Sequence, residues 1–378
     1  MVKKGKLTTV VFCVFLAGLL AWHIGLPDKD RSETENRTLA QFPEFSWENL
    51  KNGSFTAGME DYFADQFPLR DDWTGLKARC EQLLGKREFN GVYLCGDTLI
   101  AKVDEPDRLQ MEKNLDDVKR FGEASHGRVL LGLIPSAAEV WKDRLPQGSP
   151  SFNQAAFIQS AAEKTGLPTV DLLGALTEHT GEPIYYRTDH HWTTDGGAYL
   201  AYQEYCRSLG LTPMEVSAGD FGQVPDFYGT TYSKCLRWDQ TPDTISYLDI
   251  PDQMTVWKTN ARGEATEPQF TSGLYEMEKA GTADKYSMFL YGNQGYVTIE
   301  GRGEGRVLVV KDSYANSFVP YLIENYAEIC VIDPRSYRNS IDALMQREQF
   351  DQVLLLFSFQ TYSTTNISSY LAASAGEG

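Results

Sequence analysis

The chain has 378 residues, of which 42% are hydrophobic and 12% aromatic, so it can form a large core and does not have the composition of a disordered protein. Its formal net charge is −17. A surface that acidic repels phosphate groups, so we expect no nucleic acid partner and no peripheral binding to anionic lipid headgroups. Cys13 lies in the apolar N-terminal stretch. The other five cysteines match no zinc-binding pattern, and buried unpaired thiols are the simplest interpretation.

The N-terminus has the pattern of a membrane anchor. Lys3, Lys4 and Lys6 precede an uncharged, apolar stretch over residues 7–27, which is long enough to cross the roughly 30 Å hydrocarbon core. Lysines before the span predict a cytoplasmic tail over residues 1–6 and a single-pass cell-membrane protein whose remaining chain lies outside. A cleaved signal peptide is the alternative, although no A-x-A site follows the apolar run.

The next segment, residues 28–85, predicts a polar stem and amphipathic helices. Apolar residues recur on one helix face at Phe55, Met59, Tyr62 and Phe63, and a second helix is expected over residues 73–84.

Strands and helices then alternate. We expect a hairpin over residues 91–100, a buried strand at 129–134, a strand at 169–172 and a helix over 194–209. Three more apolar runs follow at residues 307–310, 329–332 and 353–357. Apolar runs separated by helices predict an α/β fold with an open, doubly wound parallel sheet. Residues 216–300 differ, because they are rich in Gly, Thr, Tyr and Asp, and we interpret them as an insertion of short strands and loops.

Ser313 directly follows the apolar run at 307–310 and precedes a segment in which Pro320 suits the first turn of a helix. A serine between a strand and a helix can expose its hydroxyl, while nearby N–H groups meet a developing oxyanion. The alternative is structural, because serine at this position often only caps the next helix.

Asp189, His190 and His191 form the second notable group. A serine nucleophile needs a neutral imidazole to take its proton and a carboxylate to orient that imidazole, and Asp189 with His191 can supply both. Two alternatives remain open. The three side chains could bind a metal, although no second ligand cluster completes a site, or the Asp–His pair could only hold a loop.

A resemblance to a known family extends over most of the exported chain. Thr188 to Thr193, followed by Gly196 and Gly197, resembles the signature of the DHHW family of bacterial exported proteins, which is similar to the SGNH-like proteins of alginate O-acetylation, the AlgJ/AlgX type. Other matching stretches are residues 35–40, 52–55, 65–70, 90–94, 135–136 and 311–314.

The resemblance implies Ser313 as nucleophile, His191 as base and Asp189 as the acid that orients it. It implies supporting roles for His190, Trp192, Asp312 and Tyr314, and an SGNH-like catalytic domain over residues 86–215 and 301–378. The histidine block precedes the serine block, which suggests a permuted order of motifs. Lys311 stands where the family usually has glycine, and the oxyanion donor has only two candidates, Gln360 and Asn293, either of which could be a turn residue.

The function implied is O-acetylation of a cell-surface or exported polysaccharide through an acyl-serine. A multipass membrane acyltransferase is the expected donor-side partner, and no cofactor or metal is expected. An acetylesterase would need the same three residues. A non-catalytic polysaccharide-binding or assembly protein and a metal-dependent hydrolase are the remaining hypotheses.

Overall fold

The computed structural model describes residues 2–32, 34–35, 37–125, 128–337, 339–367 and 371. Asn36, within one of the matching stretches, and residues 372–378, at the end of the expected catalytic domain, lie outside the described residues. The chain divides into two compact units, one of residues 1–86 with 233–239 and the other of residues 87–232 with 240–378.

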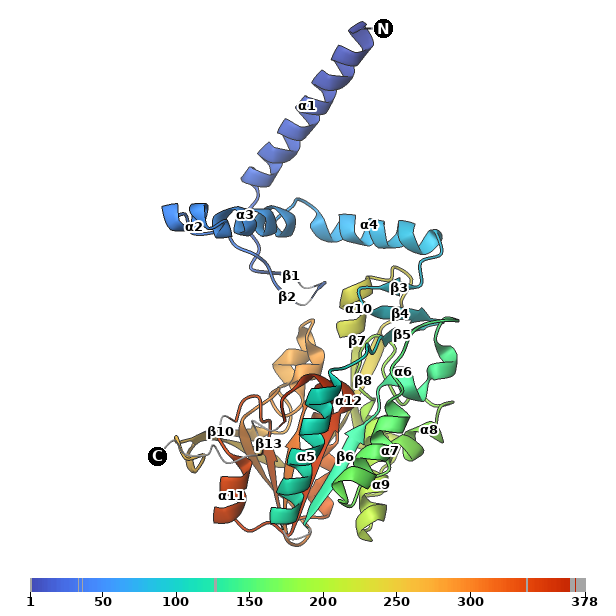
Figure 1. The fold of residues 1–378 in the computed structure, drawn as a ribbon, viewed down its shortest axis with the longest axis vertical. Helices are drawn as coiled ribbons and strands as arrows, with labels where there is room; N and C mark the ends of the chain where they lie inside the picture. The colour runs from blue at the N-terminus through green and yellow to red at the C-terminus, as the bar shows by residue number, and fades with distance from the viewer. Residues whose placement is uncertain are drawn as a thin grey trace. The chain divides into compact units, whose positions relative to one another are not determined.

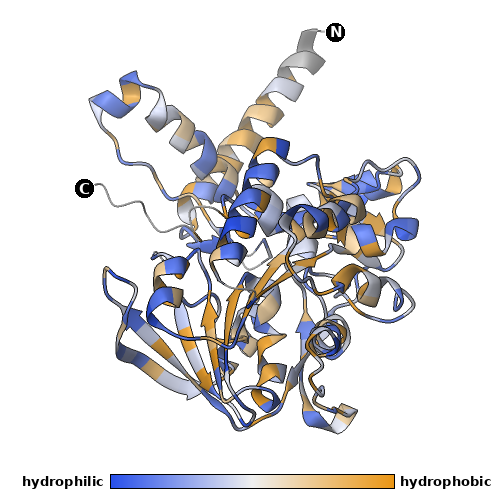
Figure 2. Ribbon diagram, turned by 60° about the horizontal axis from the view of Figure 1, so that its bottom comes forward, coloured by the Kyte–Doolittle hydropathy of each residue, from blue (hydrophilic) through white to orange (hydrophobic). Residues whose placement is uncertain are grey.

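The first unit is helical. Its elements are α1 (Val2–Gly25), β1 (Arg31–Ser32), β2 (Arg37–Thr38), α2 (Trp47–Lys51), α3 (Ser54–Asp65) and α4 (Arg70–Leu83) (Figure 1). Within α1, residues Leu7–Gly25 are long and apolar enough to cross a membrane, and hydrophobic residues predominate there (Figure 2). The two amphipathic helices expected from the sequence are thus present as α3 and α4, and α1 is a candidate membrane span.

The second unit is built on a seven-stranded sheet in the order β10-β9-β11-β13-β12-β14-β6. The parallel part consists of β6 (Val129–Ile134), β14 (Gln352–Ser358), β12 (Arg306–Lys311) and β13 (Glu328–Ile332). Three antiparallel strands extend it, β11 (Tyr296–Glu300), β9 (Gln253–Thr259) and β10 (Ala265–Gly273). The α/β class is therefore confirmed, but the sheet is mixed rather than wholly parallel.

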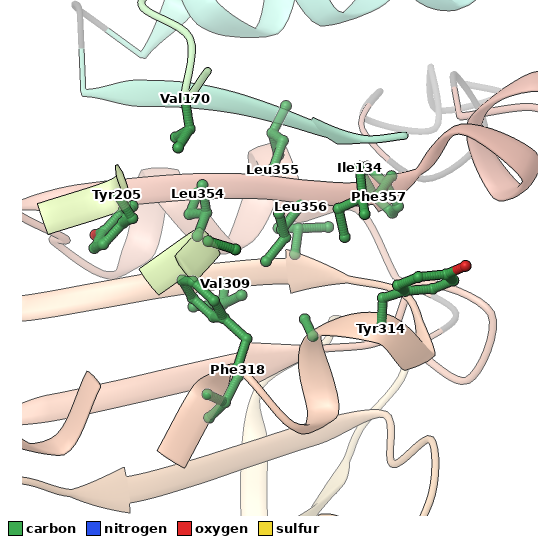
Figure 3. Close-up of a cluster of buried hydrophobic side chains, with 14 of the residues drawn as sticks. Ile134, Val170, Tyr205, Val309, Tyr314, Phe318, Leu354, Leu355, Leu356 and Phe357 are labelled. Carbon is green, nitrogen blue, oxygen red and sulfur yellow. The ribbon is translucent and has the colours of Figure 1, made fainter. Parts of the chain in front are cut away.

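Both faces of the parallel strands are covered. Every residue of β6 is buried, as are all but the first residues of β12 and β14, although successive side chains point to opposite faces. Figure 3 shows such side chains from β6, β12 and β14 together with Tyr205 and Phe318. The helices of this unit are α5 (Arg108–Ala124), α6 (Ala137–Val140), α7 (Gln154–Thr165), α8 (Leu172–Thr177), α9 (Tyr199–Leu209), α11 (Ile341–Arg347) and α12 (Phe359–Thr364).

Smaller elements surround this core. They include the sheet of β3 (Glu88–Phe89), β4 (Val92–Cys95) and β5 (Thr98–Ala101), and the pair β7 (Phe221–Phe227) and β8 (Asp243–Leu248). The short helix α10 (Thr230–Cys235) follows β7, and its residues from Ser233 on belong to the first unit. Several short 3₁₀ segments complete the unit, of which η5 (Lys285–Met288), η6 (Ser313–Asn316) and η7 (Val319–Glu324) matter for the site.

Two local predictions need correction. The strand expected at residues 169–172 is wrong, because only Thr169 pairs, in an isolated bridge with Leu131. The Asp171 carboxylate accepts a hydrogen bond from the backbone of Gly174 and starts α8, which ends the extended segment. Within residues 216–300, short strands and loops are present, but β9, β10 and β11 are integral to the main sheet. The division into a catalytic domain and an insertion stays a prediction.

Candidate active site

The site lies where β12 ends. Asp312 caps the short helix η6, because its carboxylate accepts a hydrogen bond from the backbone N–H of Tyr314 at 3.0 Å. The other Asp312 oxygen accepts from the backbone and the hydroxyl of Ser358 at the end of β14, at 2.8 and 2.6 Å. Capping therefore falls to Asp312, and the hydroxyl of Ser313 is left for another partner.

That partner is His191. The Ser313 Oγ lies 2.8 Å from His191 Nε2, and His191 Nδ1 lies 2.5 Å from Asp189 Oδ1. Asp189 is ionised, so His191 Nδ1 carries the proton of this bond, and Nε2 is free to accept the proton of the serine hydroxyl. The three residues, taken from two stretches far apart in the sequence, thus form one continuous hydrogen-bonded chain.

Three hydrogen bonds join these distant stretches. The indole N–H of Trp192, which is fully buried, donates to the carbonyl of Tyr314 at 2.8 Å and to Ser317 Oγ at 3.0 Å. In return, the Tyr314 hydroxyl donates to the carbonyl of His190. Residues 189–192 and the turn that begins at Ser313 are therefore joined by the side chains of Trp192 and Tyr314, which gives both a structural role.

The Asp189 carboxylate is buried and fully bonded. The backbone N–H and the hydroxyl of Thr230 donate to Asp189 Oδ2 at 2.7 and 2.9 Å, and the backbone N–H of His191 donates to Oδ1 at 2.9 Å. Burial alone would raise the pKa of Asp189, but the adjacent His190 and His191 outweigh it and hold that pKa well below its usual value. The group is therefore a carboxylate at neutral pH.

Burial has the opposite effect on the imidazole. It lowers the pKa of His191 to about 4, with a further lowering from His190, against the opposing influence of Asp189. His191 is only 5% exposed because Tyr286 stacks on it, with ring centres 3.8 Å apart and planes at 11°. The His190 ring lies nearby, with its centre 3.9 Å from that of His191. At neutral pH the imidazole is uncharged, as a general base must be.

His190 is half-buried and differs from His191 in its bonding. Its Nδ1 lies 2.7 Å from the Thr230 hydroxyl. That hydroxyl has one proton, which it donates to Asp189, so it accepts the Nδ1–H of His190. His190 thus supports the Asp189 carboxylate through Thr230.

Asp189, His190 and His191 could each offer one ligand atom to a metal, since these atoms lie within 4.8 Å of one another. The contacts already described occupy both Asp189 oxygens, Nδ1 of His190 and both ring nitrogens of His191. A metal held by these atoms would have to break the Asp189–His191–Ser313 chain. His126, one of the other histidines in the chain, lies outside the described residues.

The two candidates for the oxyanion donor, Asn293 and Gln360, have fewer contacts that link them to the site. Asn293 is exposed, and its side-chain oxygen accepts from Lys311 Nζ at 3.2 Å and from the Asn316 amide at 3.3 Å. Gln360 is exposed in the first turn of α12. Neither has a hydrogen bond to Ser313 among those found for the described residues, so both stay predictions.

Lys311, which stands where the family usually has glycine, is buried, and its side chain points to the end of the neighbouring strand β13. Its ammonium lies 3.2 Å from Asp333 Oδ2, at the end of β13, and burial lowers its pKa. Arg335 also pairs with Asp333, at 2.5 Å. The lysine is thus accommodated in an ion-pair network and takes no part in the Ser313 contacts.

Sequence reasoning missed three residues of the site. Tyr286 covers His191, Thr230 bonds Asp189, and a Cβ atom at Gly229 would lie 2.3 Å from Asp189 Cβ. All three belong to residues 216–300. No local pattern marks them, because their importance depends on which side chain they meet.

Comparisons with known proteins agree with this fold and with the resemblance to the DHHW family. The DHHW protein family matches residues 151–332, a stretch that contains Asp189, His191 and Ser313. The probable alginate O-acetylase AlgJ of Pseudomonas fluorescens is 25% identical over 219 residues, covering 54% of this chain and 52% of that protein. AlgJ of Azotobacter vinelandii is 21% identical over 176 residues. The chain spans about half the length of these curated relatives.

Two solved structures share the fold. A DHHW family protein from Eubacterium siraeum is 25% identical with a TM-score of 0.64, covering 75% of this chain and 97% of that one. Bacillus cereus PatB1, solved with a sulfonyl adduct, is 18% identical with a TM-score of 0.58, covering 74% and 98%. The resemblance to the DHHW family, and through AlgJ to the alginate O-acetylation proteins, is therefore confirmed.

Proposed function

We propose that this chain is an extracytoplasmic O-acetyltransferase that modifies a polysaccharide through an acetyl-serine at Ser313. The observation that carries the proposal is the hydrogen-bonded chain from Asp189 through His191 to Ser313, with a buried, neutral imidazole at its centre. The names of the AlgJ relatives supply the substrate class, a polysaccharide.

The proposed reaction has two halves. His191 Nε2 takes the proton of Ser313, the Oγ attacks the acetyl carbonyl carbon of the donor, and the leaving group departs with the proton from His191. The acetyl-serine is then attacked by a sugar hydroxyl, whose proton passes to His191 and then to the released serine. Asp189 stabilises the imidazolium that forms in each half. Water in place of the sugar would make the same site an acetylesterase.

The location and partners belong to the same proposal. With α1 as a membrane span and a cytoplasmic N-terminus, the site lies outside the cell membrane, where a multipass membrane acyltransferase would hand over the acetyl group.

The test uses the full chain in lipid nanodiscs with a chromogenic acetyl ester. We expect turnover in the parent and a loss of about 10⁴-fold or more in Ser313→Ala and in His191→Ala. Ser160→Ala is the matched control, because its hydroxyl donates to the carbonyl of Phe157 in its own helix, and it should keep the parent rate. Intact-protein mass spectrometry should find one acetyl group on the parent and none on Ser313→Ala.

Adding a polysaccharide with free hydroxyls separates transfer from hydrolysis, because only a transferase moves the acetyl group to the sugar. Turnover that survives Ser313→Ala and stops with a chelator would replace the proposal with a metal site at Asp189, His190 and His191. If the folded parent shows neither turnover nor an acetyl adduct, polysaccharide binding becomes the better hypothesis.

A further inference from the structure

Helix α4 turns its apolar side outward. Leu69, just before the helix, Trp73 and Leu76 are each about half exposed, and Leu83 and Leu84 are more than four-fifths exposed. Cys80 is exposed as well, so the expectation of a buried thiol is wrong for this cysteine. At 3.6 residues per turn these six positions share one face, within an arc of about 100°. The apolar stripe is therefore continuous along the helix.

The opposite face of α4 is the one that packs on protein. Ala78 is buried, and the Asp71 carboxylate accepts from the hydroxyls of Ser32 and Thr34, both at 3.4 Å. A helix on the surface of a water-soluble domain has the reverse arrangement, with its apolar stripe against the core. The orientation of α4 thus fits an apolar surrounding.

Aromatic side chains extend the same character to the other end of this unit. Phe42, Phe45 and Trp47 are each more than half exposed. The Phe45 ring lies 5.6 Å from that of Trp47, and the Phe42 ring lies 5.4 Å from that of Tyr62 in α3. Of these rings, those of Trp47 and Tyr62 are amphipathic, and such rings concentrate at the boundary between lipid and water.

The end of α1 fixes where this unit would meet a membrane. His23, in the last turn of α1, bonds through Nδ1 to the carbonyl of Gln66 at 3.0 Å, and its ring lies 5.1 Å from that of Phe63. Figure 1 shows α2, α3 and α4 lying crosswise to α1 at its C-terminal end. If α1 crosses the bilayer, the three helices therefore lie at the level of the headgroups.

We propose that α2, α3 and α4 form a platform that lies flat in the membrane interface, with the stripe from Leu69 to Leu84 and the exposed aromatic rings in contact with lipid. Continuity with α1 selects lipid as the occupant. Acidic side chains outnumber basic ones in residues 28–86, so the platform favours zwitterionic lipid and binds by burying apolar surface rather than by charge. The expected repulsion from anionic headgroups is thus compatible with it.

Cys80 provides a probe within the stripe. The full chain carrying Cys13→Ser is reconstituted into phosphatidylcholine vesicles, and a nitroxide is attached to Cys80. Collisions with oxygen, which dissolves in lipid, are compared with collisions with a water-soluble nickel chelate. The matched control moves the cysteine to the exposed turn between β9 and β10, as Cys13→Ser with Cys80→Ser and Arg262→Cys.

We expect the label at Cys80 to collide mainly with oxygen and the label at position 262 mainly with nickel. Trp73→Glu with Leu76→Glu should raise nickel collisions at Cys80 severalfold while vesicle flotation, which α1 ensures, is unchanged. Equal nickel access at the two positions would overturn the proposal, as would failure of the parent to float. A label shielded from both reagents would also overturn it, because a protein contact would then cover the stripe. None of these readouts depends on catalysis.

Discussion

Tyr286 should set the pH range in which the site works. Its ring lies parallel to that of His191 at 3.8 Å and excludes water from one face of the imidazole. Replacing it in Tyr286→Leu keeps an apolar side chain but opens that face. Because burial is the main reason for the low pKa of His191, we expect that pKa to rise in the variant.

The expected rise in the pKa of His191 follows from the difference between its value and that of an ordinary histidine. An ordinary histidine has a pKa of 6.5, and that of His191 is about 4, a difference of about 3 kcal/mol between the two protonation states. Tyr286 covers one ring face and His190 lies close by, so we assign about half of the effect to Tyr286. The pKa should therefore rise by about one pH unit.

The assay is the pH dependence of kcat/KM for acetyl ester turnover. The base acts in its neutral form, so activity falls as the pH drops through the pKa of His191, with a midpoint near 4 in the parent and about 5 in Tyr286→Leu. Rates at pH 7 should be close to each other. Tyr286→Phe keeps the stacked ring and should keep the parent midpoint. An unmoved midpoint in Tyr286→Leu, with the fold intact by circular dichroism, would refute the reasoning, as would an equal movement in Tyr286→Phe.

Three further predictions concern the surroundings of the same imidazole. Gly229→Ala should displace Asp189 and cost about 100-fold or more in acetyl ester turnover. Gly219→Ala is the control, because its new Cβ meets nothing closer than 3.8 Å, and its turnover should be close to that of the parent. Equal turnover in Gly229→Ala and Gly219→Ala would contradict the geometry. Thr230→Val should lower the free energy of unfolding in urea by about 2 kcal/mol, whereas Thr230→Ser should not. The pKa of His191 is lower in the folded chain than in the unfolded chain, so the unfolded chain binds more protons between pH 6.5 and about 4. The neutral imidazole therefore contributes up to about 3 kcal/mol to the free energy of unfolding, and this contribution is lost as the pH falls through that range. His191→Gln should therefore lose less stability than the parent between pH 7 and pH 5, and an equal loss would show that His191 is not buried in its neutral form.

The sequence predicted the elements whose patterns are local. The apolar runs at 129–134, 307–310, 329–332 and 353–357 became the four parallel strands, because fully buried strands need apolar side chains on both faces. The two amphipathic helices of the first unit were also predicted from a local pattern, the apolar and polar residues of each segment. The expected strand at residues 169–172 failed because a single capping carboxylate, Asp171, starts α8 at Leu172 and ends the extended segment.

The site was predicted from a different kind of signal. Asp189, His191 and Ser313 were chosen by residue type and by resemblance, and the structure brings them within hydrogen-bonding distance. The contacts that hold them there could not be predicted. The indole bond of Trp192 to the Tyr314 carbonyl joins segments more than a hundred residues apart, and nothing in either segment indicates its partner.

Residues 216–300 show why such a site cannot be divided along the sequence. This region was interpreted as an insertion, yet Thr230 bonds the Asp189 carboxylate and Tyr286 stacks on the His191 ring. Both contacts act on electrostatics: the first stabilises the carboxylate charge, and the second keeps water from the imidazole. Asp189, His191 and Ser313 would keep their identities without this region, but the imidazole would be hydrated and its carboxylate less firmly held. The proposed chemistry of Ser313 therefore depends on three separate stretches of chain, of which only two, residues 188–193 and 311–314, were marked by the resemblance to the family.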